Sequence, residues 1–303
     1  MKKFISKLTM ISLPFIIVPI IFIVRFGYPP PKLSSSLSFN AKILFIKENH
    51  LQSEIDVLAI GSSMSLNNLH TETLKNKFDN KFLNISSWGQ NIEEDFRLIK
   101  IFDSHYKPRI IIINSGYMDF KNNSKSIDYN LVENYLFENG NLVYRNINLK
   151  YLIKESKDYF LKKKDTLNYT SLTFDDCGGI NLQKSNFNID PKRWEGIDIK
   201  NLQLNINQYN YLDSISQYCM KKNIKLVFIQ NPFRKNYYLN LDDQALNLLG
   251  THINKIKSIL NKRNQLFINP KFTFWEDSLF IDYSHFSKEG SKYYTEYCLN
   301  KIN

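Results

Sequence analysis

Short apolar runs alternate with longer amphipathic stretches from about residue 55 to the end of the chain. The runs have the length and the branched aliphatic content of strands, and they occupy residues 55–60, 82–85, 109–114, 225–230 and 265–268. Helical periodicity is found between and after them, at residues 71–78, 92–102, 202–221, 245–260 and 288–299. This alternation predicts an α/β fold with a mainly parallel sheet, because parallel strands are joined by helical crossovers. The unbroken isoleucines from Ile110 to Ile113 are typical of a strand buried on both faces.

The segment from residue 120 to about 200 does not follow this alternation. Glu138-Asn139-Gly140-Asn141 lies between apolar segments and predicts a hairpin turn. Leu149 to Lys163 has the pattern of a helix. We therefore expect one α/β domain over residues 51–303 that carries an insertion at about 120–200.

The N-terminal residues have the pattern of a membrane anchor. Three lysines among the first seven residues precede an uncharged run, Leu8 to Val24, which spans roughly 26 Å as a helix at about 1.5 Å per residue. A cleaved signal peptide is the alternative, but no small-x-small cleavage site follows the run. We expect residues 1–27 to form a cytoplasmic stub and one transmembrane helix, and residues 28–50 a juxtamembrane linker. The charge distribution places the main domain outside the cytoplasm.

Charge and metal-ligand spacing exclude some classes of function. The formal net charge of +11 could indicate an anionic partner, but Lys, Asn, Ile, Phe and Tyr are all abundant and share A/T-rich codons, and no basic run of five residues occurs. We therefore expect no nucleic acid partner. Neither the five histidines nor the three cysteines have metal-ligand spacing, so no metal is expected. Cys219 and Cys298 lie in apolar helical patterns and are interpreted as buried thiols. Cys177 lies in a predicted loop, where its thiol could be exposed or form a disulfide.

Two polar motifs carry candidate chemistry. Ser63 follows the first predicted strand, and Gly61 lets the backbone turn sharply at the carboxyl end of that strand, where open α/β sheets bind ligands. Asp282 precedes His285 by three residues, so its carboxylate can accept a hydrogen bond from one ring nitrogen while the other faces a serine. A serine hydroxyl is a weak nucleophile without such a base. Ser63, Asp282 and His285 are therefore candidate catalytic residues. The alternative is purely structural, with a Gly-Ser-Ser turn and with Ser284 or Ser287 capping the following helix.

From about Asp56 to its end, the chain resembles the SGNH/GDSL hydrolase superfamily, in particular its membrane-anchored members that acylate or deacylate bacterial cell-surface polysaccharides. Gly61-Ser62-Ser63 stands where the family has Gly-Asp-Ser, and Asp282-x-x-His285 matches the last block. Asn84 to Gln90 is similar to the second block, and the resemblance implies an oxyanion hole built from the backbone amides of Ser63 and Gly89. It also implies a three-layer α/β/α domain with a flavodoxin-like sheet, and no cofactor.

One block departs from the family pattern. Gly116-Tyr117-Met118-Asp119 stands where the family has Gly-x-Asn-Asp, and the thioether of Met118 cannot donate a hydrogen bond to an oxyanion. Losing one such donor typically costs about 10²–10³ in turnover. Either another group, for which the candidates are Asn67, Asn91 and Asn114, fills that role, or activity is low or absent.

These observations support two classes of function. The first is a serine-dependent ester hydrolase or O-acyltransferase that acts on a cell-envelope glycan, with the insertion as an acceptor-binding lid. Its expected partners are the membrane, the acylated glycan and, for a transferase, a membrane acyl-donor protein. The second is a catalytically inactive glycan-binding or scaffold protein of an envelope polysaccharide assembly system, which the Met118 substitution favours.

Overall fold

Five parallel strands form the sheet of the main domain. The computed structural model describes residues 2–26, 30–121, 126–138, 149–165, 169–184 and 190–302. The strands are β1 (Val57–Ile60), β2 (Phe82–Asn84), β3 (Ile110–Ser115), β4 (Lys225–Gln230) and β5 (Leu266–Ile268). All pair in parallel in the order β2-β1-β3-β4-β5, which is the flavodoxin-like order. The predicted α/β class and all five predicted strands are confirmed.

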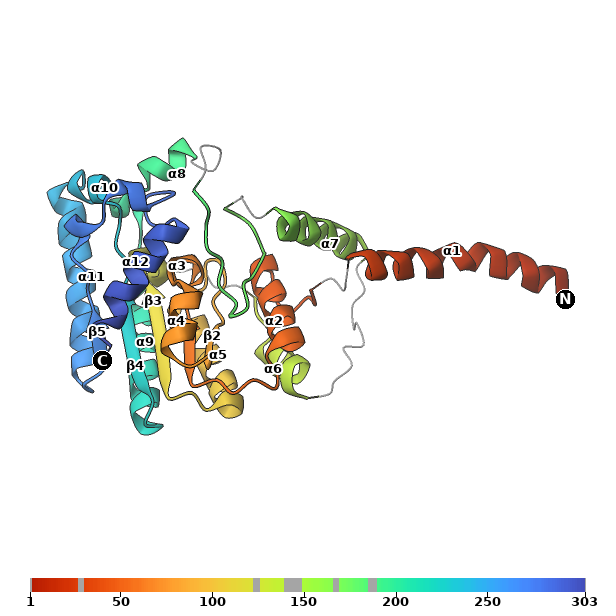
Figure 1. Cartoon of the computed structure of the whole chain (residues 1–303), viewed down its shortest axis with the longest axis horizontal. Helices are drawn as coiled ribbons and strands as arrows, with labels where there is room; N and C mark the ends of the chain where they lie inside the picture. The colour runs from red at the N-terminus through yellow and green to blue at the C-terminus, as the bar shows by residue number, and fades with distance from the viewer. Residues whose placement is uncertain are drawn as a thin grey trace.

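Helices cover both faces of the sheet and produce three layers (Figure 1). On one face Leu58, Ile111 and Phe228 pack in a cluster with residues of the helices α5 (Ile92–Tyr106), α9 (Ile206–Lys221) and α11 (Asp243–Asn261). On the other face Ala59 and Ile112 pack with residues of the helices α4 (Thr71–Lys77) and α12 (Lys288–Leu299). Successive strand residues point to opposite faces, so strands buried on both sides need the continuous apolar runs seen in the sequence.

The N-terminal helix α1 (Lys2–Phe26) extends away from the main domain in Figure 1. It includes the run from Leu8 to Val24, where we expected a transmembrane helix. Over the described part of the chain, no helix reaches both the length and the apolar character needed to cross a bilayer.

A helix occupies most of the stretch where we expected a juxtamembrane linker. The helix α2 (Leu37–Asn49) packs into the main core through Phe39, Ile43 and Ile46. Its N-cap is Ser36, whose side chain accepts a hydrogen bond from the Phe39 amide at 3.3 Å. The helix α2 thus contributes to the same core as the sheet.

The segment between β3 and α9, where we expected an insertion, contains helices and turns. Its helices are α6 (Tyr129–Phe137), α7 (Leu149–Lys164) and α8 (Pro191–Glu195), with short 3-10 turns at Tyr117–Phe120 and Ile199–Asn201. The predicted helix at Leu149–Lys163 is confirmed. The predicted hairpin turn at Glu138–Asn141 lies mostly outside the described residues, and the described residues before it are helical.

The remaining short elements of the described chain are α3 (Ser63–Asn68), α10 (Lys235–Leu239) and the 3-10 turns at Phe272–Phe274 and Asp277–Leu279.

Candidate active site

The turn after β1 presents Ser63 at the start of α3. Gly61 has φ +141°, and a Cβ there would lie 3.0 Å from the Asn114 carbonyl oxygen and 3.1 Å from the Ser65 Cβ, so a side chain would be both strained and crowded. Ser62 then caps α3, because its hydroxyl accepts a hydrogen bond from the Met64 amide at 3.1 Å. Ser62 is buried and Ser63 is partly exposed, so the turn offers one accessible hydroxyl.

Ser63, His285 and Asp282 form one hydrogen-bonded chain. The Nε2 atom of His285 lies 2.9 Å from the Ser63 Oγ, although the two residues are 222 positions apart in the sequence. The Nδ1 atom lies 2.8 Å from the Asp282 Oδ2. With a carboxylate on Nδ1, the neutral ring carries its proton there and presents an unprotonated Nε2 to the serine. The structure thus brings together all three residues singled out in the sequence.

The Asp282 carboxylate is buried and well supplied with donors. Its Oδ1 accepts the backbone N–H groups of Ser284 at 2.8 Å and His285 at 2.7 Å. Burial by itself raises the pKa of this carboxyl, but the attraction of His285 and the hydrogen bonds from His285 and the two amides outweigh burial and lower the pKa. Asp282 is therefore held as a carboxylate, the form that can orient the ring.

A second buried carboxylate supports the turn that contains Ser63. Asp119 follows β3, and its Oδ2 accepts hydrogen bonds from the Ser115 hydroxyl at 3.0 Å and the Gly116 amide at 2.9 Å. Its side chain also hydrogen-bonds Ser62, the neighbour of Ser63. Burial raises the pKa of Asp119 in spite of these donors. The half-buried Met118 directly precedes Asp119 in the same 3-10 turn.

The loop after β2 lies against the same turn. The Ser87 amide donates to the Gly61 carbonyl at 3.2 Å, and Gln90 closes a turn back to Ser87 at 3.4 Å. Gly89 lies in this turn with φ +59° and is exposed. The loop that contains Gly89, which we expected to contribute an oxyanion amide, is thus hydrogen-bonded to Gly61, two positions before Ser63.

Asn68, at the other end of α3, links the nucleophile helix to the histidine loop. Its Oδ1 accepts the Phe286 amide at 2.9 Å, and its Nδ2 donates to the Ser284 carbonyl at 2.9 Å. The Nδ2 group also donates to the Oδ1 of Asn231 at 2.7 Å, and Asn231 itself donates to the Ser284 carbonyl at 2.9 Å. All these groups are buried. The backbone on both sides of His285 is therefore fixed to the helix that begins with Ser63.

Three asparagines were candidates for the donor that Met118 lacks, and two of them are occupied elsewhere. Asn114 donates to the Met64 carbonyl at 2.8 Å and accepts the Tyr294 hydroxyl at 2.9 Å. Asn91 caps α5 by accepting the Glu94 amide at 2.9 Å. Asn67 is 1% exposed, and among the described residues neither of its side-chain polar atoms has a hydrogen-bond partner.

The insertion adds Tyr169 to the site, which the sequence did not single out. Its hydroxyl oxygen lies 2.8 Å from the Nε2 and 3.0 Å from the Nδ1 of His285. The two rings are nearly perpendicular, at 87° with centroids 4.9 Å apart. No periodicity marks this residue in the sequence, because it lies in a loop.

No cluster of three or more His, Cys, Asp or Glu side chains suited to a metal ion occurs among the described residues. All three cysteines are free and buried. The interpretation of Cys219 and Cys298 as buried thiols is confirmed, but Cys177 is not the exposed loop thiol that the sequence allowed.

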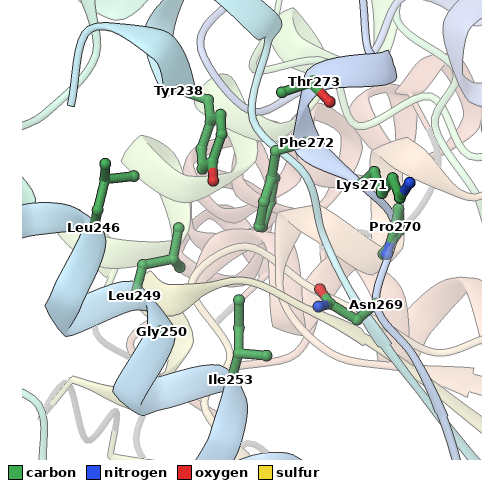
Figure 2. A pocket seen from close by; sticks show the side chains of 10 residues that line it. All are labelled: Tyr238, Leu246, Leu249, Gly250, Ile253, Asn269, Pro270, Lys271, Phe272 and Thr273. Carbon is green, nitrogen blue, oxygen red and sulfur yellow. The ribbon is translucent and has the colours of Figure 1, made fainter.

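A separate pocket of about 360 Å³ lies between α11 and the segment after β5 (Figure 2). Its lining is largely apolar and includes Leu249, Ile253 and Phe272. No residue of the Ser63-His285-Asp282 chain contributes to it. Stacked rings connect the pocket to the loop that carries Asp282. Phe272, which lines the pocket, stacks on Phe233 with ring centroids 5.7 Å apart, and Phe233 stacks on Tyr283 with centroids 6.0 Å apart.

Comparison with known proteins finds likenesses in structure only. No family model matches the chain, and no curated protein matches it. Among solved structures it is similar to the psychrotrophic esterase EstA from Pseudoalteromonas sp., with 12% identity, 82% of this chain and 96% of that chain covered, and a TM-score of 0.40. It is also similar to a GDSL-like lipase from Bacteroides thetaiotaomicron, with 9% identity, 87% and 97% covered, and a TM-score of 0.45. A third is Axe2, an acetyl xylan esterase from Geobacillus stearothermophilus, with 12% identity, 82% and 94% covered, and a TM-score of 0.44.

Proposed function

We propose that this protein is a serine-dependent ester hydrolase or O-acyltransferase that works through a covalent acyl-serine intermediate. The observation that carries the proposal is the chain of contacts from Ser63 through His285 to Asp282, at 2.9 and 2.8 Å. A nucleophile, a base within hydrogen-bond reach and a third group that orients the base are what such chemistry requires.

In the proposed reaction His285 works first as a base and then as an acid. The Ser63 Oγ attacks the acyl carbonyl carbon while its proton passes to the Nε2 of His285, and Asp282 stabilises the imidazolium that forms. Collapse of the tetrahedral intermediate breaks the bond to the leaving alcohol, which takes the proton from Nε2. A water molecule or a sugar hydroxyl then attacks the acyl-enzyme, giving a hydrolase or a transferase respectively.

The carbonyl oxygen becomes an anion during both attacks and needs hydrogen-bond donors. The backbone amides of Ser63 and Gly89 are the proposed donors. The hydrogen bond from the Ser87 amide to the Gly61 carbonyl supports this assignment, because it holds the loop that contains Gly89 against the nucleophile turn. Donors fixed in advance stabilise the developing charge without further reorganisation.

We further propose a cell-envelope glycan ester as the substrate and a membrane-tethered, extracytoplasmic location for the domain. Support for the location comes from the three lysines that precede the uncharged run in α1. Support for the glycan comes from the family resemblance alone. A membrane acyl-donor protein belongs to the proposal only if the enzyme is a transferase.

A second candidate function is binding without catalysis. Met118 favours it, because the residue at that position donates no hydrogen bond to an oxyanion. The intact contacts of Ser63 with His285 oppose it, since a binding module has no need of an activated hydroxyl. The two candidates differ in one measurable property, which is turnover of an ester.

Hydrolysis of 4-nitrophenyl acetate by variants with the hydroxyl or the base removed tests the proposal. Ser63→Ala and His285→Ala should each abolish turnover with little change in melting temperature. Asp282→Asn should retain partial activity, because it impairs the orientation of the ring and leaves the base in place. Groups that act as a unit lose activity non-additively, so the Ser63/His285 double variant should be no slower than either single variant. Unchanged turnover in Ser63→Ala would remove the mechanism.

A further inference from the structure

The hydroxyl of Tyr169 occupies an unusual position at the site. It lies within 3.0 Å of both ring nitrogens of His285, and each of these nitrogens already has another partner. Nδ1 faces Asp282 at 2.8 Å and Nε2 faces Ser63 at 2.9 Å. A hydroxyl this close to both nitrogens lies over the face of the ring, whereas Asp282 and Ser63 meet its edge, so it displaces neither partner.

The Tyr169 hydroxyl lies close to the nucleophile. The Tyr169 oxygen lies 2.8 Å from the Nε2 of His285, and the same nitrogen lies 2.9 Å from the Ser63 Oγ, so the O–H is near the atom that attacks the acyl carbon. Burial raises the pKa of Tyr169, so the phenol keeps its proton at neutral pH and remains a donor. Donors must lie about 3 Å from the place where the oxyanion forms, and that place is one carbonyl bond away from the carbon that bonds Ser63.

No other side chain considered for this role is as well placed. Asn114 and Asn91 use their side chains within the fold. Both polar atoms of Asn67 are enclosed by protein, whereas Ser63, which must meet the substrate, is partly exposed. Met118 offers a thioether. Tyr169 is the described side-chain donor that contacts the base close to the nucleophile.

We propose that Tyr169 donates the oxyanion hydrogen bond that Met118 cannot. The inference rests on the proposed serine mechanism. As the Ser63 Oγ bonds to the acyl carbon, its proton goes to the Nε2 of His285 and the carbonyl π pair moves to oxygen. That oxygen accepts hydrogen bonds from the backbone amides and from the Tyr169 O–H, without transfer of the phenolic proton. When the carbonyl reforms and the leaving alcohol departs with the proton from Nε2, the bond to Tyr169 weakens.

The segment that carries Tyr169 is built to hold it in place. Arg193 covers the Tyr169 ring, with its guanidinium 4.0 Å from the ring centroid. Further along, the carboxylate of Asp175 accepts the amides of Cys177 at 3.0 Å and Gly179 at 2.9 Å. The Ile180 amide then bonds the Leu66 carbonyl of α3 at 3.0 Å. The loop that follows Tyr169 is thus hydrogen-bonded to the helix that begins with Ser63.

Removing only the hydroxyl tests the inference. Tyr169→Phe should lower kcat for 4-nitrophenyl acetate by roughly 10²–10³-fold, the usual effect of losing one oxyanion donor, with KM and the melting temperature nearly unchanged. Tyr169→Ala should be at least as slow. Tyr238→Phe is the matched control, since Tyr238 lines the separate pocket, and it should retain wild-type kcat. The rate of Ser63 labelling by a fluorophosphonate should fall in Tyr169→Phe and stay unchanged in the control.

Other outcomes distinguish failure of the Tyr169 proposal from failure of the serine mechanism. A wild-type rate in Tyr169→Phe, while Ser63→Ala is inactive, overturns the role of Tyr169 and leaves the serine mechanism standing. A faster Tyr169→Ala also overturns it, because the tyrosine would then be a plug over the site. A large loss in Asn67→Ala with none in Tyr169→Phe would move the donor to Asn67. If Ser63 is neither required for turnover nor labelled, the serine mechanism itself fails and this inference fails with it.

Discussion

The side chain of Asn68 hydrogen-bonds the backbone on both sides of His285, accepting the Phe286 amide and donating to the Ser284 carbonyl, each at 2.9 Å. Asn68 is five residues after Ser63 on the same short helix. One amide side chain therefore fixes the distance between the nucleophile and its base.

Removing this amide should misplace the base. We expect Asn68→Ala to lower kcat by roughly 10²-fold, since a shift of about 1 Å at a catalytic group has that effect. It should also cost about 1–3 kcal/mol of stability, because buried backbone groups lose their partners. Steady-state kinetics and thermal unfolding measure the two effects. Asp103→Ala is a suitable control for loss of a buried hydrogen-bonding group, because Asp103 accepts the Tyr218 hydroxyl at 2.6 Å near the C-terminal end of α5, away from the site. Equal kcat losses in both variants would contradict a positioning role for Asn68.

The position of Met118 gives a second test of the oxyanion hole. If Tyr169 already supplies the third donor, Met118→Asn should change the wild-type kcat by no more than about threefold. In the Tyr169→Phe background the same change should raise kcat by at least about tenfold, because the new amide then donates the oxyanion hydrogen bond that the tyrosine no longer supplies. Measuring the four proteins of this double-mutant cycle side by side decides the matter. An equal gain in both backgrounds would show that the two side chains act independently.

Lys42 of α2 should make the stability of the fold depend on pH. Its buried ammonium donates to the Asn84 carbonyl at 3.0 Å and to the Gly178 carbonyl, and burial lowers its pKa to about 7, an effect that Asp175 partly offsets. Above this pKa the unfolded chain binds a proton that the folded chain does not, so stability should rise with pH from about 7 to about 10, by up to about 1.4 kcal/mol per pH unit. Lys42→Met should remove this slope in denaturant unfolding. Parallel pH profiles for the two proteins would contradict the assignment.

Cell fractionation tests the proposed location. If α1 is an uncleaved anchor, the protein should remain in the membrane fraction after carbonate extraction and keep its N-terminus. Protease added to intact cells should digest the main domain. A variant beginning at residue 30 serves as the control and should be released from membranes. Release of the full-length protein by carbonate, or a mature N-terminus after Val24, would contradict the anchor.

The sequence predicted the sheet well and the rest of the core less well. Branched apolar runs identified every strand to within two residues, because strands buried on both faces have no polar side. The helix α2 was missed since it buries Ser38, Asn40 and Lys42 together with Phe39 and Ile43, and so shows no apolar stripe. Asn40, for example, is satisfied by the backbone amides of Leu33 and Ser34, at 3.2 and 2.9 Å, which no local pattern reveals.

For the site, the sequence predicted the residues whose place follows from a strand end or from a short motif. Ser63 follows β1 directly, and Asp282 and His285 are three residues apart, so topology and spacing were sufficient. Tyr169 and Asn68 could not be predicted in this way. Their roles depend on contacts with a loop more than 100 residues away in sequence, and such contacts exist only in the folded chain.

Labelling with an activated fluorophosphonate tests the central claim most directly, because it requires a nucleophile, a base and an accessible site together. We predict a single modification that peptide mapping places on Ser63. The modification should be absent in Ser63→Ala and strongly slowed in His285→Ala. Absence of labelling in the folded wild-type protein, or labelling at another residue that persists in Ser63→Ala, would contradict the claim that Ser63, His285 and Asp282 form an active catalytic site.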